Sequence, residues 1–475
     1  FSHEGIYLAG SSHWLPSIEG EALNTFTLTV ILDEEWNLVS QGTRIRNELI
    51  DGKQIVTYDS PNPMDDVYLI AGKWTEYSLN TGEVLVQAFL RSPDEELANR
   101  YLGVTEYYLD LYENLIGNYP FTKFALVTNV WETVYVMLSV TLLSEQVICF
   151  PCILHSSYPH ELLHNYWGNS VFVDYEGGNW CEGITAYMAD HLIKEQQGSA
   201  VEYRRNTLQK FTDYVNEDND FPPSDFTSRN NPAEEAIGYG KVMMFNNMLR
   251  DEVGDEMFLK AYTDFYKNNK FNFASYDDIR TSFEKVTGKD LKATFDQWIK
   301  RKGAPALEIS DLKLSEENGE FKLSFNLNQI QESKAFSLQV PFYTYLENGE
   351  GPLFEKIEMD KKTIQYTASY DRRPLKISVD PHFNLMRLLD RSEVPATLSQ
   401  LFGAAKACII LPSKSSVLDD FRTMAEFWQQ SQDAQGKDLI IYLDNEIDYL
   451  PDEIPVWVFG YENMFRKEVY LSGSY

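Results

Sequence analysis

The sequence predicts a multidomain α+β protein from its length, its composition and a change of hydrophobic period along the chain. It has 475 residues, which exceeds what one core usually organises, and 43% of them are hydrophobic. Strand patterns come first, helical patterns dominate the middle, strands return, and the tail alternates. We therefore expect a β domain over residues 1–82, a mainly helical domain over 83–303, a small β domain over 304–395 and an α/β unit over 396–475.

The first part is expected to be a set of strands. Residues 22–32, 68–71 and 84–90 carry apolar and Thr-rich strand patterns, with Asp-Gly and Asn-Pro turn signals between them. The chain begins at Phe1 rather than at a methionine, so we expect this domain to be truncated at its start. The visible sequence therefore leaves open whether the protein is cytoplasmic or exported.

The middle of the chain has a helical period. The first predicted helix spans residues 94–116, and its apolar positions are Leu97, Tyr101, Val104, Tyr108 and Leu111. A strand is expected at 123–130, and Pro159 is expected to start the next helix. Further helices are predicted at 187–193, 201–215, 233–252, 255–266, 276–286 and 291–300, with a loop at 218–231.

The last third returns to strands and then alternates. Strands are predicted at 321–327, 336–340, 375–379, 407–411, 439–443 and 456–459, and a helix at 418–430. The tail has no Gly-rich phosphate loop, so the sequence gives no reason to expect a nucleotide there.

Composition excludes some partners. The formal net charge of −31 disfavours nucleic acid and anionic membrane surfaces, and a solvated acidic surface accounts for it. No apolar run reaches the roughly 18–20 residues that span a bilayer, so we expect no transmembrane segment. The oligomeric state is left open.

The cysteines predict neither a structural metal site nor a thioredoxin-like unit. Cys149 and Cys152 form a single CxxC with no second pair to complete four ligands, and Cys181 and Cys408 stand alone. We expect all four to be buried thiols.

The segment Pro-His-Glu-Leu-Leu-His at residues 159–164 carries the main chemical signal. On a helix, His160 and His164 lie on one face and can bind one metal ion, with Glu161 about 100° further round. That position suits a general base acting on water beside the metal. Glu182, in Asn-Trp-Cys-Glu-Gly at the predicted start of a second helix, supplies a third ligand. Two histidines and a glutamate leave a coordination position open, which is typical of catalytic zinc.

These motifs resemble the gluzincin peptidases of the M1 aminopeptidase family. The resemblance rests on HELLHNYWGN (160–169), NWCEG (179–183), Tyr239-Gly240-Lys241 and FDQWIKRKGAP (295–305), and covers roughly residues 1–305. It implies a peptide substrate and one Zn²⁺ per chain, held by His160, His164 and Glu182. It implies that Glu161 is the general base and that Tyr239 donates a hydrogen bond to the oxyanion. It also implies a thermolysin-like zinc catalytic domain over 83–303 and a β-sandwich-like domain over 304–395.

The chain departs from the family at two places. Seventeen residues, where the family has eighteen, separate the second histidine from the glutamate ligand, and loop 171–178 can absorb the deletion. In the family's Gly-x-Met-Glu-Asn strand, Met137 matches the methionine, but Leu138 and Ser139 replace the glutamate and asparagine. A leucine cannot pair with a substrate's α-ammonium. We therefore expect altered recognition of the N-terminal amine, with Met137 contacting the substrate and Glu132 as a substitute anchor.

Three hypotheses follow from this resemblance. The first is a zinc peptidase of M1 type with altered amine specificity. The second is a zinc-loaded relative that binds peptides with little turnover. The third is another hydrolase on the same metal site, such as an epoxide hydrolase, which the M1 family accommodates.

Overall fold

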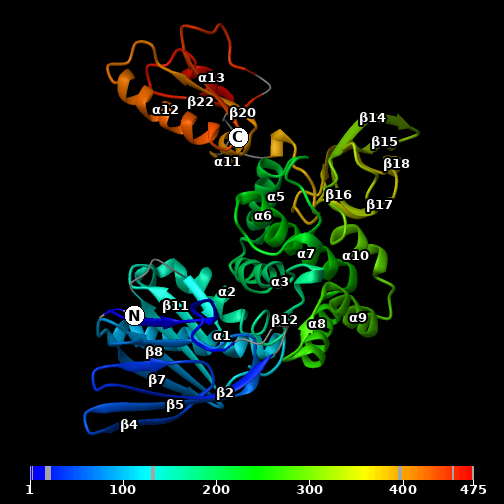
Figure 1. Ribbon diagram of the computed structural model, residues 1–475. Helices are drawn as coiled ribbons and strands as arrows, with labels where there is room; N and C mark the ends of the chain where they lie inside the picture. Colours follow the sequence, from blue (N-terminus) through cyan, green and yellow to red (C-terminus); the bar gives the residue numbers. More distant parts are fainter. Residues whose placement is uncertain are drawn as a thin grey trace. The chain divides into compact units, whose positions relative to one another are not determined.

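The fold is multidomain α+β, with several sheets and many helices (Figure 1). The computed structural model describes all residues except 1, 3, 17–22, 130–133, 394–397, 452–453 and 473–475. The chain divides into two compact units. The first comprises Phe1–Ala200, Pro222–Ser228 and Val242–Arg301; the second comprises Val201–Phe221, Arg229–Lys241 and Lys302–Tyr475. The four-part division predicted from the sequence stays a prediction.

The first unit contains most of the strands and helices that the structure describes. Its strands are β1 Ile6–Leu8, β2 Asn24–Asp33, β3 Asn37–Val39, β4 Thr43–Ile50, β5 Lys53–Met64, β6 Leu69–Gly72, β7 Thr75–Thr81, β8 Val84–Leu90, β9 Lys123–Asn129, β10 Val134–Met137, β11 Val140–Ser144, β12 Phe172–Val173 and β13 Phe273–Ala274. Its helices are α1 Glu95–Leu115, α2 Ser157–Leu163, α3 Cys181–Thr185, α4 Leu192–Gln196, α7 Val242–Val253, α8 Asp255–Asn269, α9 Tyr276–Thr287 and α10 Lys292–Trp298.

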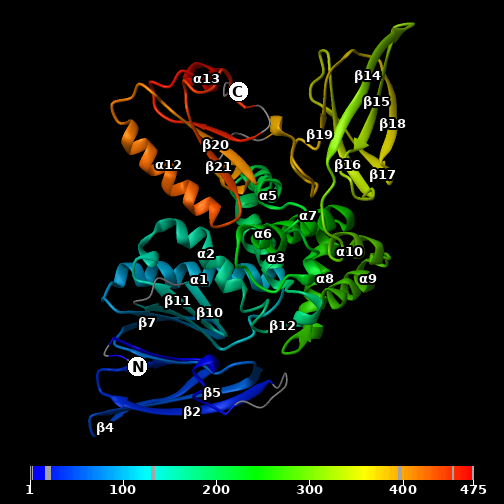
Figure 2. The same ribbon diagram turned by 45° about the horizontal axis from the view of Figure 1, so that its top comes forward.

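A mixed sheet in the order β10-β11-β9-β8-β7 organises the first unit. Its inner strands pair in parallel, and β10 and β7 pair antiparallel to their neighbours at the two edges. Helix α1 packs on β7, β8 and α2, and Figure 2 shows α1 and α2 on the same face of this sheet. Helices therefore cover one face of the parallel strands, and Val39 of β3 and Ile70 of β6 belong to the same core cluster as Phe89, Ala125 and Val127 of these strands.

Helix α1 begins where the sequence predicts, because Asp94 accepts a hydrogen bond from the Leu97 backbone N–H and caps the first turn. Its buried stripe is centred one position beyond the predicted one. Of the predicted apolar positions only Tyr101 and Tyr108 are buried, and the buried residues are Ala98, Tyr101, Leu102, Thr105, Tyr108, Leu109 and Tyr112.

Three buried tyrosines of α1 hold the segment that leads into α2. The hydroxyls of Tyr101, Tyr108 and Tyr112 donate to the backbone carbonyls of Ile148, Leu154 and Pro159, at 2.9, 2.8 and 3.0 Å. A buried phenol needs such a partner. These bonds fix the path of residues 148–159 against α1, and with it the start of α2.

The expectation that all four cysteines are buried is wrong for the CxxC pair. Cys149 and Cys152 are exposed, whereas Cys181 and Cys408 are buried. The pair lies in two short 3₁₀ turns over residues 147–155, which run along the surface before α2 instead of entering a core.

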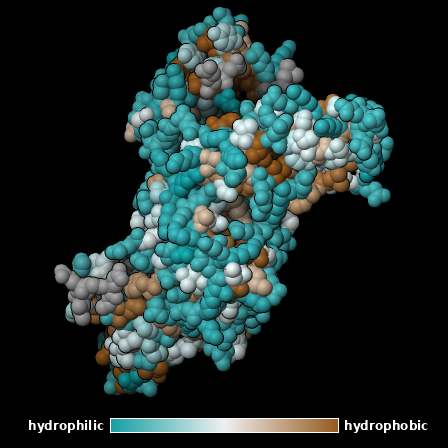
Figure 3. All heavy atoms as spheres, turned by 90° about the vertical axis from the view of Figure 1, so that its right-hand side faces the viewer, coloured by the Kyte–Doolittle hydropathy of each residue, from teal (hydrophilic) through white to brown (hydrophobic). Residues whose placement is uncertain are grey.

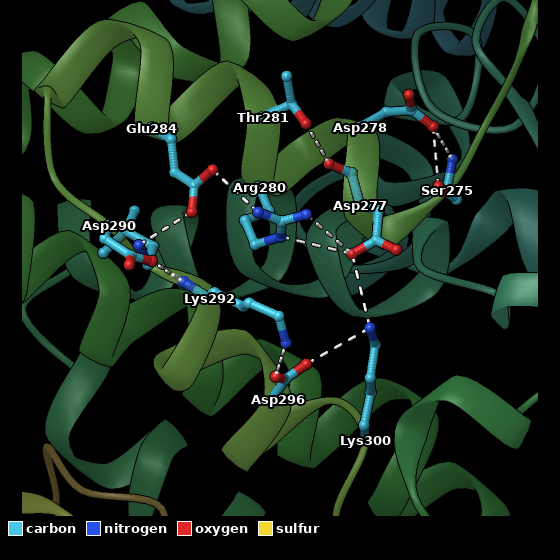
Figure 4. A network of polar contacts seen from close by, with 11 residues as sticks. Ser275, Asp277, Asp278, Arg280, Thr281, Glu284, Asp290, Lys292, Asp296 and Lys300 are labelled. Carbon is cyan, nitrogen blue, oxygen red and sulfur yellow. Dashed lines mark hydrogen bonds and ion pairs between the residues drawn. The ribbon is translucent and has the colours of Figure 1, made fainter.

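A surface network stabilises the α9–α10 corner (Figure 4). Arg280 pairs with Asp277 and Glu284, and Lys300 joins Asp277 to Asp296. The side chains of Ser275 and Asp278 form a capping box at the start of α9. Each exposed pair alone contributes little, but together they fix the turn between the two helices.

Lys123, the first residue of β9, is 2% exposed. Burial, with a smaller contribution from Arg44, lowers the pKa of its ammonium from 10.5 to about 7. Between these pH values the unfolded chain holds the proton more tightly than the folded chain does. The contribution of Lys123 to the free energy of unfolding therefore rises with pH from about 7 to about 10, and is level below pH 7.

We expect the stability of wild type relative to Lys123→Met to increase between pH 7 and pH 9, by at most about 1.4 kcal/mol per pH unit. Denaturant unfolding of both proteins at several pH values measures this difference. A difference that stays constant or decreases over this window would contradict the assigned burial of the charge.

The second unit contains helices and three further sheets. Its helices are α5 Ala200–Tyr214, α6 Pro232–Glu235, α11 Leu398–Gly403, α12 Leu418–Asp433 and α13 Arg466–Ser472. Its strands are β14 Leu307–Glu317, β15 Glu320–Gln329, β16 Leu338–Leu346, β17 Leu353–Met359, β18 Thr363–Tyr370, β19 Pro374–Val379, β20 Lys406–Leu411, β21 Asp438–Leu443 and β22 Val456–Val458.

Strands β14–β19 form two sheets, in the orders β14-β15-β18 and β17-β16-β19. Phe325 and Tyr366 of the first sheet pack on Phe342 of the second, with ring centroids 5.2 and 5.1 Å from that of Phe342. The tail forms a parallel sheet in the order β21-β20-β22 with α12 against it, which agrees with the predicted strand and helix positions.

The surface is mostly polar, as Figure 3 shows for one face, with scattered apolar patches. None of the described helices is long and apolar enough to cross a membrane.

Candidate metal centre

Helix α2 presents His160 and His164 on one face. Their ring centroids are 4.8 Å apart, as expected for imidazoles one helical turn from each other. The helix begins at Ser157, two residues before the predicted start. Pro159 is tolerated inside the first turn because the backbone N–H groups there have no helical acceptor.

Helix α3 brings Glu182 to the two histidines. Asn179 accepts a hydrogen bond from the Cys181 N–H at 3.1 Å and so fixes the start of the helix. The Glu182 Oε2 atom lies 3.4 Å from His164 Nε2 and 3.7 Å from His160 Nε2. Ligand atoms of the three residues all lie within 4.8 Å of one another, and the residues form a possible metal site.

The Nδ1 atom of each imidazole lies within hydrogen-bond distance of an acceptor oxygen. His160 Nδ1 lies 3.1 Å from Asp190 Oδ2, and His164 Nδ1 lies 3.1 Å from the Trp167 carbonyl oxygen. A proton on each Nδ1 satisfies these acceptors and leaves the Nε2 lone pair directed toward Glu182. Gly168 follows Trp167 with φ +98°, which favours glycine and turns the chain after α2.

Asp190 reaches His160 because of a local widening of the helix after Glu182. Residues Ala186–His191 form a π-helix between α3 and α4. In a regular α-helix a residue eight positions on lies about 80° round from Glu182. The wider π turn returns Asp190 to the face of Glu182. Sequence reasoning missed this residue, because nothing in the local pattern signals the widened turn.

The donor set fits zinc. Two imidazole nitrogens and one carboxylate oxygen are ligands that zinc prefers, at about 2.0–2.2 Å. Two such ligands in a tetrahedral arrangement lie about 3.3 Å apart, close to the 3.4 and 3.7 Å measured here. The second contact of each imidazole completes the orientation that metal-binding histidines usually have.

The charges of the cluster act on one another. Burial raises the pKa of the Glu182 carboxyl, but His164 and His160 outweigh burial and hold it well below its usual range. For Glu161 burial prevails over the two histidines, and its pKa is raised. Burial disfavours the charged forms of both imidazoles, but Asp190 acting on His160 and Glu182 acting on His164 raise their pKa values.

Asp190→Asn is expected to weaken zinc binding by roughly 10–100-fold, because the amide no longer attracts the proton on His160 Nδ1 as a carboxylate does. Competition with a chromogenic chelator measures the affinity. Asp110→Asn, at an exposed position of α1, serves as the control. Equal affinities of the two variants would contradict the orienting role of Asp190.

Residues 155–298 match the peptidase family M1 domain. Over these residues the chain is similar to M1 peptidases.

The M1-like chain has relatives among aminopeptidases. It is 24% identical to the glutamyl aminopeptidase of Bitis rhinoceros over 325 residues, 65% of this chain and 33% of that protein. It is 27% identical to the mitochondrial aminopeptidase 2 of Saccharomyces cerevisiae over 177 residues, 36% and 18% of the two chains. The chain therefore spans a third or less of these relatives.

Among solved structures, aminopeptidase A of Legionella pneumophila in complex with aspartic acid resembles the M1-like chain. The TM-score is 0.64 and the identity 16%, over 88% of this chain and 50% of that chain. This similarity concerns the fold.

Three predicted site residues of the M1-like chain remain: Tyr239, Glu132 and Met137. Tyr239 belongs to the second unit, in a π-helix over Ala236–Lys241, with the Arg229 guanidinium 5.4 Å from its ring centroid. Its role as an oxyanion donor stays a prediction. Glu132 lies outside the described residues.

Met137, Leu138 and Ser139 do not continue as one strand. Met137 pairs with Val140, so β10 ends there and the next two residues form a tight turn. Met137 is 1% exposed and belongs to a core cluster, and Leu138 is 2% exposed. Substrate contact by Met137 stays a prediction that this burial does not favour.

Proposed function

We propose that this chain is a zinc-dependent peptidase that hydrolyses peptide bonds with water, with altered recognition of the substrate's N-terminal amine. The observation that carries the proposal is the convergence of His160, His164 and Glu182, with Glu161 on the same helix as both histidines. The similarity of residues 155–298 to the M1 peptidase domain supports a peptide substrate. The single cluster of possible metal ligands among the described residues supports one zinc per chain.

Each residue of the proposed site has a different role in hydrolysis. A bound zinc ion lowers the pKa of water from about 15.7 to about 7 and polarises a carbonyl. Glu161 takes the proton of the attacking water and delivers it to the leaving amine. Asp190 and the Trp167 carbonyl hold the imidazoles in the required tautomer. Tyr239, by its match to the family, donates to the oxyanion, an interaction worth about 3 kcal/mol.

The domain assignment belongs to the same proposal. Residues 83–303 are a thermolysin-like zinc catalytic domain, which the position of the M1 match supports. Residues 304–395 are β-sandwich-like, which the packing of Phe325 and Tyr366 on Phe342 supports. Residues 1–82 are the N-terminal β domain, and 396–475 the C-terminal α/β unit.

Altered amine recognition is supported by the turn after Met137. Leu138 stands where the family carries a glutamate, and its side chain is buried and apolar. The amine near this turn, that of Lys123, donates to Ser139. Neither residue attracts an ammonium, so we infer that a free N-terminus is not the main determinant of binding.

Matched peptides with free and acetylated N-termini, incubated with metal-assayed protein, test this function. We expect zinc-dependent cleavage of both, within about tenfold of each other in kcat/KM, since an exposed ion pair contributes up to about 1 kcal/mol. Cleavage of free-amine peptides alone would overturn the altered recognition. Binding of both without cleavage would favour a peptide-binding relative. Cleavage of neither, with turnover of an epoxide, would favour another hydrolase.

A further inference from the structure

The turn that ends β10 is held from two sides by buried side chains. The Ser139 backbone N–H donates to Asn165 Oδ1 at 2.7 Å, and Lys123 Nζ donates to Ser139 Oγ at 2.9 Å. The Ser139 carbonyl accepts from the Ala125 N–H at 2.9 Å. Ser139 and Asn165 are fully buried, and Lys123 is nearly so. In such surroundings each hydrogen bond is costly to lose.

Asn165 connects this turn to the metal-binding helix. It is the residue immediately after His164, and its Nδ2 donates to the Leu162 carbonyl at 2.9 Å. One amide group therefore contacts the end of α2 with its nitrogen and the β10–β11 turn with its oxygen. Strand β10 also packs directly on α2.

Ser139 needs this support. Its φ is +58°, in the left-handed region that a non-glycine residue enters at a cost of about 1 kcal/mol or more. Hydrogen bonds to its N–H, its carbonyl and its hydroxyl hold it there.

Burial of the Lys123 amine beside this turn costs free energy. Among the described residues it has no carboxylate partner, and its Nζ donates to the hydroxyl and the carbonyl of Ser139. An apolar side chain would avoid the cost of burying an amine. The amine lies 5.7 Å from the centroid of the Tyr58 ring, and its hydrogen bonds go to Ser139, which an apolar side chain cannot bond.

Strand β10 lies at the edge of its sheet, and an extended peptide can pair with such an edge. We propose that Asn165 and Lys123 are positioning residues, which lock the β10–β11 turn to the end of α2 and so hold the edge strand at a fixed distance from the metal ligands. This role rests on the proposed function, because it concerns how a peptide is held for hydrolysis.

Steady-state kinetics of purified, zinc-assayed variants test the role. Asn165→Ala is expected to raise KM about tenfold, corresponding to the loss of one buried hydrogen bond, with kcat changed less than threefold and the zinc content unchanged. Lys123→Met is expected to raise KM in the same direction. Asn165→Asp retains an acceptor for the Ser139 N–H, and its KM is expected to lie nearer that of wild type.

Asn246→Ala is the matched control. Asn246 is 1% exposed, its Nδ2 donates to the Val242 carbonyl of its own helix, and its Oδ1 accepts from the Tyr262 hydroxyl of another helix. It reproduces the burial and bonding of Asn165 away from β10. We expect a loss of stability with KM unchanged.

Hydrogen exchange adds a readout that does not depend on turnover. In Asn165→Ala, the Ser139 amide, followed in peptides covering residues 134–144, is expected to exchange at least tenfold faster than in Asn246→Ala. Equal KM values for the two alanine variants, with an active wild type, would overturn the positioning role. A zinc-loaded wild type without peptidase activity would instead overturn the proposed function.

Discussion

Glu161→Gln is expected to lower peptide hydrolysis by about 10²–10⁴-fold while one zinc per chain stays bound. Glutamine has the size and shape of glutamate but cannot take a proton from water, and general-base catalysis contributes about this factor. The position of Glu161, one residue after His160 on α2, places it beside the metal ligands instead of among them. Its removal therefore affects the proton transfer and not the metal.

The measurement is kcat with zinc determined on the same sample. Glu176→Gln, an exposed carboxylate between α2 and α3, is the control and should keep full activity. If Glu161→Gln retained more than about a tenth of wild-type activity, another group would be the base.

Glu182→Ala is expected to lose zinc and activity together. The binding free energy of a protein zinc site is about 10–16 kcal/mol. A third of it, about 3–5 kcal/mol, corresponds to roughly 10²–10⁴ in affinity. The contacts of Glu182 Oε2 with both Nε2 atoms make it the shared neighbour of the two histidines. Zinc affinity by chelator competition should therefore rank wild type and Glu161→Gln first, Asp190→Asn next and Glu182→Ala last.

If Glu182→Ala bound zinc as tightly as Asp190→Asn does, Glu182 would not be a zinc ligand.

Regular elements were predictable wherever the local pattern and the tertiary contacts agree. Helix α1 follows from the apolar period of residues 94–116, and α12 from that of 418–430. The buried stripe of α1 is shifted because Tyr112, which the predicted pattern did not include, donates a hydrogen bond to the Pro159 carbonyl. Such a contact depends on a segment more than forty residues away, which periodicity cannot report.

The sequence predicts the three residues that converge in the structure, but it does not predict their surroundings. Binding of one metal ion requires His160, His164 and Glu182 at a particular spacing, and this spacing can be read directly from the sequence. Asp190 depends on a π-helix, and Ser139 on a turn with positive φ, and neither leaves a local signal. The assignment of chain segments to the two units depends likewise on long-range contacts, and it puts Tyr239 in the second unit and α7 in the first.

The central claim, zinc-dependent peptide hydrolysis at one site per chain, is tested most directly by titrating zinc into chelator-treated protein while following cleavage of a peptide. We expect no cleavage without metal, a linear rise in rate with added zinc and a plateau at one equivalent. Full activity of the metal-free protein, or a zinc-loaded protein that cleaves no peptide, would contradict it.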